Sequence, residues 1–178
     1  ETVNYSIIRN RRRYRVKALV EKAAGFYQGN RYKDEPPYLV LGGIVFTTLS
    51  RNYLSSWGRG WYRRAPLDLR YPYYQSAYDS ELNRHRDFII LAKVLRHSVN
   101  LDVEQEQVVV ASVNGKPAYS FESFIEAIDS AKDQLRFEFY GGGQTLILSK
   151  SRVQQAEGAI KKLYHLRQMQ NRRKDNEP

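Results

Sequence analysis

The feature that most constrains the fold is a Gly-Gly pair inside a run of strand-forming residues, YLVLGGIVF, at Tyr38–Phe46. Glycine in a strand interior costs roughly 0.5–1 kcal/mol relative to alanine, so the pair needs a reason. One explanation is packing, because a bulge or a tight bend in a core strand uses glycine. The other is recognition, because a loop with unobstructed backbone amides can bind a partner's carboxylate. The run by itself leaves both explanations open.

Composition limits the classes of protein that the chain can belong to. It has 178 residues, 42% of them hydrophobic, which suits one domain with its own core. The 29 Lys and Arg against 19 Asp and Glu give a net charge of +10, which attracts phosphate, acidic proteins or anionic lipid. Cysteine is absent, which excludes disulfides, cysteine-bound zinc and thiol nucleophiles. No apolar run reaches the roughly 18 residues of a membrane span.

Two segments are predicted to be β-hairpins. Residues 3–21 and residues 135–149 each place two strand-forming runs around a polar or glycine-rich tip. A lone hairpin is marginal in water, so we expect residues 1–23 to be the tail of a preceding module. The alternative is that this hairpin adds two strands to the one domain. Residues 24–37 then read as a polar linker that ends in Pro36-Pro37.

The rest of the chain predicts a mixed fold of strands and helices. Further strands are expected at 87–95 and 107–113, and residues 51–86 read as an aromatic and arginine-rich insertion, helical near 53–57 and 76–84. Ser120 is a plausible N-cap for a helix with an apolar stripe. A terminal helix is expected over 151–170. The four stripe residues are Phe121, Phe124, Ile125 and Ile128.

The order of these segments resembles a PDZ domain of the Deg/HtrA serine proteases over about residues 35–152. The resemblance is carried by VNGKP at Val113–Pro117, FIILAKVL at Phe88–Leu95 and LGGIVF at Leu41–Phe46. It is closest to the second PDZ domain of the plant-organelle type of Deg protease and its bacterial relatives. It implies a mainly β, α+β fold: an antiparallel β-sandwich or partial barrel capped by helices at 38–152, with an N-terminal hairpin and a C-terminal helix in 153–178.

The resemblance also implies a peptide-binding groove between a strand and a helix. Gly42 and Gly43 would lie at the carboxylate of a peptide, the next three residues would supply an exposed strand edge, and the helix stripe would form the opposite wall. The same stripe also fits a purely structural core role. Departures from the family pattern, RHSVNLDVEQEQ at 96–107 among them, leave open whether the ligand is a chain tail or an internal segment. The implied peptide-binding residues are Leu41, Gly42, Gly43, Ile44, Val45, Phe46, Phe121, Phe124, Ile125 and Ile128.

Catalysis by this chain is not predicted. No serine-nucleophile motif of the G-x-S-x-G or G-N-S-G-G type occurs, and a Ser-His-Asp triad needs a serine in such a turn. The histidines at 85, 97 and 165 lack the spacing of metal ligands, so we expect neither a metal nor another cofactor. By resemblance, the chain is the regulatory part of a Deg/HtrA-like serine endopeptidase in protein quality control. The catalytic triad would lie elsewhere in that protein.

The insertion combines aromatic and basic side chains, which favours a macromolecular contact. We expect a protein interface, since Trp, Tyr and Arg are enriched at such interfaces. The alternative is a stand-alone basic adaptor for nucleic acid or anionic surfaces, with cations on phosphates and rings on bases. Expected partners are therefore protein or peptide segments, with assembly into a homo-oligomer through the parent protease. The compartment would be the cell envelope in a bacterium or an organelle in a plant. The expected interface residues are Trp57, Trp61, Tyr62, Arg63 and Arg64.

Overall fold

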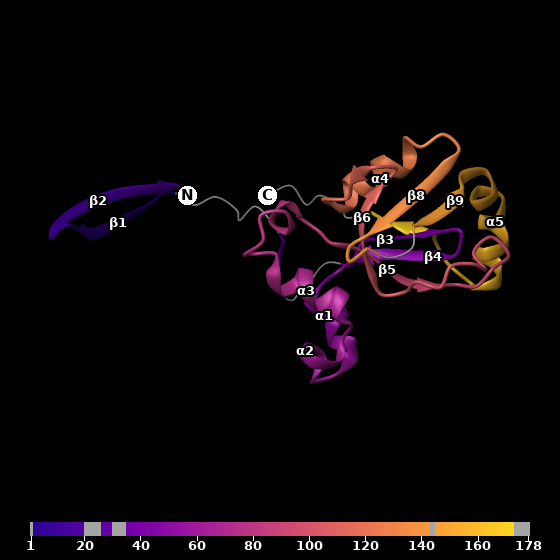
Figure 1. Ribbon diagram of the computed structural model, residues 1–178, viewed down its shortest axis with the longest axis horizontal. Helices are drawn as coiled ribbons and strands as arrows, with labels where there is room; N and C mark the ends of the chain where they lie inside the picture. Colours follow the sequence, from indigo (N-terminus) through magenta and orange to yellow (C-terminus); the bar gives the residue numbers. More distant parts are fainter. Residues whose placement is uncertain (1, 20–25, 30–34, 143–144, 173–178) are drawn as a thin grey trace.

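The computed structural model describes residues 2–19, 26–29, 35–142 and 145–172 (Figure 1). Within them, eight strands form one antiparallel sheet in the order β10-β3-β4-β5-β6-β8-β9, with β7 paired to β6. The sheet curves without closing, and helices cover it, so the predicted mixed α+β fold is confirmed. The strands are β3 (Tyr38–Leu41), β4 (Ile44–Thr48), β5 (Ile89–Val94), β6 (Val108–Val113), β7 (Lys116–Pro117), β8 (Gln134–Phe139), β9 (Leu146–Ser149) and β10 (Gln170–Asn171).

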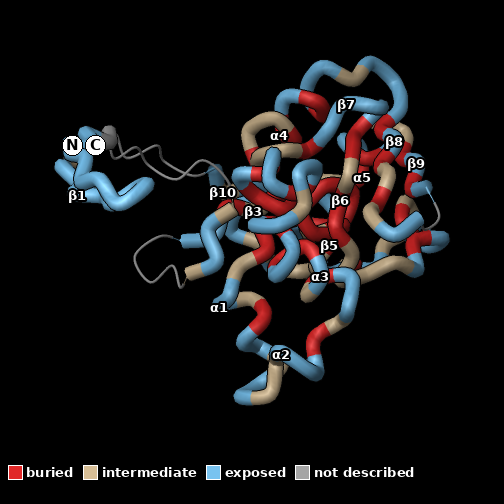
Figure 2. Tube along the Cα trace, turned by 60° about the vertical axis from the view of Figure 1, so that its left-hand side comes forward, coloured by how far each residue is buried: buried red, intermediate tan, exposed pale blue. Residues whose placement is uncertain are grey.

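The main core lies between the curved sheet and helix α4 (Phe121–Asp129) (Figure 2). In β8 the side chains alternate, with Leu135 and Phe137 fully buried and their neighbours facing outward, as the two-residue period of a strand requires. Helix α4 begins where the sequence predicts. The Ser120 side chain accepts a hydrogen bond from the Ser123 N–H, and the Ser123 hydroxyl oxygen accepts one from the Ser120 backbone N–H. This reciprocal cap fixes the start of the helix.

A second core, behind the sheet, is built by the insertion. Phe88, just before β5, and Ile90 belong to it, whereas Ile89 and Leu91 of β5 belong to the main core. The central strands are therefore covered on both faces, and the predicted insertion is part of the packed domain. Its helices are α1 (Arg51–Leu54), α2 (Trp61–Arg64) and α3 (Leu67–Gln75), with 3-10 turns η1 (Ser55–Trp57) and η2 (Leu82–Arg84).

The C-terminal segment differs from the prediction. Helix α5 (Lys150–Leu163) buries Val153, Ala156 and Ile160, as its spacing indicates. The predicted continuation to residue 170 is wrong. His165 has a φ of 50°, a left-handed conformation that a helix cannot contain, and the chain then extends into β10. After this turn, residues 166–172 run to the edge of the sheet that lies opposite β9.

The N-terminal hairpin forms as predicted, from β1 (Thr2–Arg9) and β2 (Arg12–Leu19). Its two-residue tip has Asn10 and Arg11 at φ of 52° and 59°. Within the part of the chain that the structure describes, these strands pair only with each other, as a two-stranded sheet apart from the eight-stranded one (Figure 1). The closing hairpin, β8 and β9, instead contributes its apolar face to the main core.

Candidate functional site

The Gly-Gly pair forms a two-residue turn between β3 and β4. Gly42 and Gly43 have φ angles of 57° and 83°, in the left-handed region where glycine carries no steric penalty. A Cβ atom on Gly43 would overlap the carbonyl oxygen of Leu95 and lie 2.6 Å from Nδ2 of Asn100. A tight bend and close packing therefore explain why glycine is needed here. Binding of a carboxylate by the same turn stays a prediction.

Asn100 fastens this turn to the neighbouring loop. Its side chain is buried, and Nδ2 donates to the carbonyl oxygens of Gly42 at 2.7 Å and Leu95 at 2.8 Å. The Leu95 N–H in turn donates to the carbonyl oxygen of Gly43 at 2.7 Å. Both glycine carbonyl groups are thus bonded inside the domain. Sequence reasoning missed Asn100, because nothing in the local run SVNLD distinguishes it from an ordinary loop residue.

Strand β4 has a partner on each side. It pairs with β3 through Leu41↔Ile44 and Leu39↔Phe46, and with β5 on its other edge. The expectation that Ile44, Val45 and Phe46 supply an exposed sheet edge is therefore wrong, because β3 already takes their outward hydrogen bonds. Ile44 and Phe46 are fully buried, and Val45 is half-buried.

Helix α4 lies beside β4, as the groove hypothesis requires, and the two elements are in direct contact. The ring centroids of Phe46 and Phe124 are 5.1 Å apart. All four stripe residues are buried: Phe121, Phe124, Ile125 and Ile128. They form the main core against the sheet in this arrangement, and a role in contacting a peptide remains a prediction for them.

The outer edge of β3 is occupied by the chain's own C-terminal segment. The Val40 N–H donates to the carbonyl oxygen of Met169 at 2.6 Å, and β10 pairs antiparallel through Gln170↔Leu39 and Asn171↔Tyr38. This edge is therefore the place where an extended segment adds to the sheet. Sequence reasoning missed it because the polar run 167–172 shows no strand periodicity.

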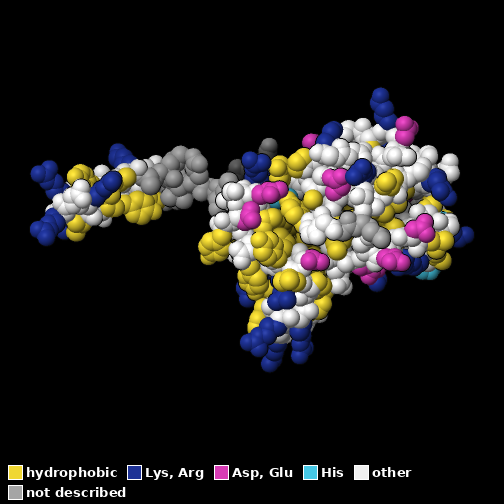
Figure 3. Space-filling view, viewed as in Figure 1, with side chains coloured by type: hydrophobic (Ala, Val, Ile, Leu, Met, Phe, Trp, Pro, Cys, Tyr) yellow, Lys and Arg dark blue, Asp and Glu magenta, His cyan; other side chains and the backbone are white. Residues whose placement is uncertain are grey.

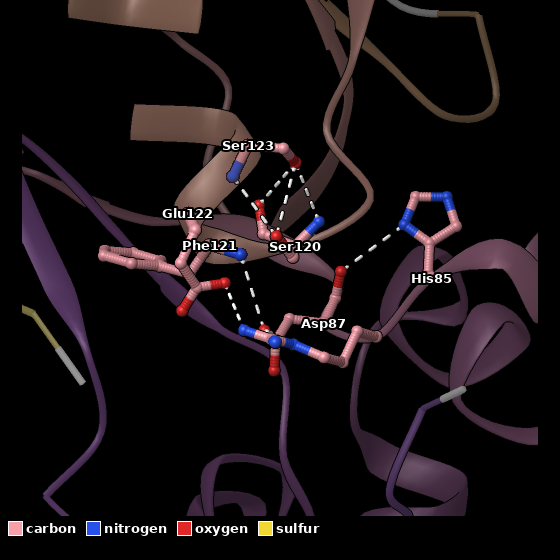
Figure 4. A network of polar contacts seen from close by, with 7 residues as sticks. His85, Asp87, Ser120, Phe121, Glu122 and Ser123 are labelled. Carbon is pink, nitrogen blue, oxygen red and sulfur yellow. Dashed lines mark hydrogen bonds and ion pairs between the residues drawn. The ribbon is translucent and has the colours of Figure 1, made fainter. Parts of the chain in front are cut away.

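A buried polar network lies at the N-terminus of α4 (Figure 4). His85 is fully buried, with Nε2 2.7 Å from the Tyr140 hydroxyl and Nδ1 3.4 Å from the Asp87 carbonyl oxygen. The Asp87 carboxylate accepts from the Phe121 N–H, a position where negative charge favours a helix. Burial lowers the pKa of His85 below its ordinary value of 6.5, and burial raises the pKa of Tyr140 to about 12.

We expect the free energy of unfolding to fall as the pH drops below about 6.5. The pKa of His85 is lower in the folded chain than its ordinary value of 6.5, so the unfolded chain binds more protons in this range. The stability that neutral His85 contributes is complete above pH 6.5. It is lost as the pH falls toward the pKa of His85 in the folded chain. Urea unfolding at pH 7.5 and 5.5 measures the difference. His85→Gln, which keeps a polar group near Tyr140, should reduce it; an unchanged difference would contradict this assignment.

The expected interface residues divide into two groups. Trp57 and Trp61 are half-buried and pack against the second core, with the Trp61 ring stacked on Tyr74 at 6.1 Å. Tyr62, Arg63 and Arg64 are exposed on α2. Figure 3 shows Lys and Arg side chains gathered at the end of the projection that carries α2. Use of this surface as an interface remains a prediction.

The geometry described above is that of a curved antiparallel sheet with a helix packed across it and an extended segment on its edge. A sequence model described as a PDZ domain matches residues 28–172. The chain belongs to the PDZ domain family. PDZ domains bind peptides or other proteins, which gives this domain a protein-interaction role in general terms. A comparison with curated proteins found no match.

Two kinds of feature are absent from the described part of this PDZ domain. Among the described residues, no helix is both long and apolar enough to cross a bilayer. The same part of the chain holds no cluster of three or more His, Asp or Glu side chains suited to a metal ion.

Proposed function

We propose that this PDZ domain is the regulatory module of a Deg/HtrA-like serine endopeptidase, where it binds extended peptide segments or connects protomers during protein quality control. The observation that carries the peptide-binding part is the edge of β3, which pairs with an extended segment through backbone hydrogen bonds. Strand addition of this kind gives affinity through the main chain. The protease context is supported by the motifs LGGIVF, FIILAKVL and VNGKP.

The N-terminal hairpin supports a multidomain parent. Tyr5 and Ile7 pair across the strands with Val16 and Tyr14, which places these four side chains on one face, and each is 40–50% exposed. An isolated two-stranded hairpin is marginal in water. We therefore propose that this apolar face packs on a preceding PDZ domain, of which residues 1–23 are the tail. A coding sequence that places an unrelated domain upstream of Glu1 would contradict both this proposal and the protease context.

A peptide array tests the proposed function. Unstructured decapeptides are immobilised internally, so that both ends are free, and are probed with the full chain at two salt concentrations. We expect a subset to bind, with affinities that change little with salt, because main-chain pairing carries the interaction. A single-stranded oligonucleotide is measured in parallel. If no peptide binds, the proposal fails.

The oligonucleotide arm tests the alternative, a basic adaptor. The observation that favours it is the exposure of Arg59, Arg63 and Arg64, which form no ion pair with any residue that the structure describes. Phosphate binding would weaken steeply with salt, and Arg63→Glu with Arg64→Glu would abolish it. If the surface is a protein interface instead, the same double variant changes oligomer size in sedimentation and leaves oligonucleotide binding absent.

A further inference from the structure

We infer that this PDZ domain recognises internal, extended, basic segments of polypeptide at the outer edge of β3, and that it needs no free C-terminal carboxylate on the ligand. The inference rests on the proposed peptide-binding function and names the ligand class. Three observations carry it: the occupant of the β4 edge, the construction of the Gly42–Gly43 turn, and the segment that lies on β3.

Strand β3 fills the position of a strand added to β4. It runs antiparallel to β4 from Leu41↔Ile44 to Tyr38↔Thr47, and its Leu39 and Leu41 side chains are buried in the main core together with α4. Because only two residues connect β3 to β4, its effective concentration at this edge far exceeds that of any free peptide. A ligand therefore does not reach the edge of β4.

The turn leaves no position for a terminal carboxylate. Where a bound peptide would end, the chain continues from Leu41 through the glycines into Ile44. The carbonyl oxygens of both glycines accept hydrogen bonds from Asn100 and Leu95. Helix α5 closes the outside of the turn, since Val153 lies 3.0 Å from where a Cβ atom on Gly42 would be. In this proposal the turn bends and fastens the chain, and the terminus of a ligand is not bound there.

The outer edge of β3 accepts the backbone of an internal segment. Gln170 and Asn171 lie along it as strand β10, and the Val40 N–H donates to the carbonyl oxygen of Met169, the residue just before that strand. The chain continues past the ladder to Arg172 and beyond. The occupant is therefore a mid-chain stretch that binds without presenting its end.

Charges beside this edge favour a basic ligand. An Arg172 guanidinium nitrogen lies 3.7 Å from the Asp129 carboxylate at the end of α4, and Asn171 Nδ2 lies 3.5 Å from a carboxylate oxygen of Glu35. The Arg172 and Asp129 side chains are 58% and 65% exposed. Exposed pairs of this kind contribute little, and β10 pairs over only two residues. The segment is thus held weakly enough to be displaced by a competing strand of the same chemistry.

The test uses the full chain and a synthetic peptide of residues 166–172, LRQMQNR, prepared as free acid and as amide. The variant Gln170→Pro with Asn171→Pro removes both backbone N–H groups of β10, because proline has none. Gln170→Ala with Asn171→Ala keeps them and is the matched control. Fluorescence polarisation measures peptide affinity, and circular dichroism checks that each variant is folded.

We expect the proline variant to bind acid and amide within about twofold of each other, and at least about tenfold more tightly than wild type, because the edge is vacated. The alanine control should resemble wild type. Adding Asp129→Arg should weaken binding about two- to fivefold. An acid that binds tenfold more tightly than the amide overturns the inference and leaves the proposed function standing. Two outcomes would show that the β3 edge is not the site. One is equal peptide affinity of the wild type and the proline variant. The other is that the variant does not bind this peptide while array peptides still bind the chain.

Discussion

Replacing Phe124 with alanine is expected to lower the free energy of unfolding by about 3–5 kcal/mol. The side chain is fully buried, and its ring lies 5.1 Å from Phe46 and 6.2 Å from Phe137 between centroids. The loss combines the transfer of the ring with the cavity left behind. Since small domains have total stabilities of about 5–15 kcal/mol, the change would remove a large share. Urea unfolding at pH 7.5 measures it.

The exposed Ile147→Ala, on β9, provides the control for Phe124→Ala. Its side chain is 56% exposed, so the change in unfolding free energy should stay within about 0.5 kcal/mol. The pair also decides between a core role and a groove role for the α4 stripe. If Phe124→Ala left stability within about 1 kcal/mol of wild type but abolished peptide binding, Phe124 would be a ligand-contacting residue, and the arrangement described above would be wrong.

Replacing Gly43 with alanine is expected to cost about 3 kcal/mol of unfolding free energy. About 1–2 kcal/mol comes from a non-glycine residue at a φ of 83°. The remainder comes from forcing the Leu95 carbonyl group and the Asn100 side chain away from the new Cβ atom. The displacement would also break the hydrogen bonds that fasten the turn. Thermal and urea unfolding both report the change.

Gly115→Ala separates these two causes. Gly115 lies in the Asn114–Gly115 turn with a φ of 75°, and a Cβ atom there would meet nothing within 4 Å. Only the conformational cost should appear, about 1–2 kcal/mol. Equal losses for the two variants would show that the contacts with Leu95 and Asn100 carry no energetic weight. A bulky residue at 43 is therefore a poor probe of ligand binding, because it would disrupt the fold first.

Local sequence signals predicted the elements whose stability is local. Ser120 as N-cap and the apolar stripe that follows it located α4, and the glycine-rich tip located the closing hairpin. Helix α3 was not predicted, because Pro72 lies inside it and proline ordinarily ends a helix. What holds α3 is distant in sequence: Leu69 packs in the second core with Phe88. A helix held by such distant contacts need not show a helical period of apolar residues in its own short sequence.

The candidate site was predicted in part. The resemblance to PDZ domains implied that the Gly42–Gly43 run and the helix at Phe121 lie side by side, and Phe46 does contact Phe124. It did not indicate which strand forms the sheet edge. That depends on whether the four residues before the glycines fold back on β4 or leave it open, and both outcomes use the same apolar residues. The pairing with β10 joins Leu39 to Gln170 and Tyr38 to Asn171, which lie far apart along the chain.

The short ladder between β3 and β10 has a consequence for amide exchange with deuterated solvent. The N–H of Val40 donates to the carbonyl oxygen of Met169, which directly precedes the two-residue strand β10. Departure of that segment therefore exposes the Val40 N–H without disturbing either core. Amides shared by β4 and β5, at the centre of the sheet, exchange only through much larger openings. Protection of the Val40 amide from exchange thus reports whether the C-terminal segment is paired with β3, independently of global stability.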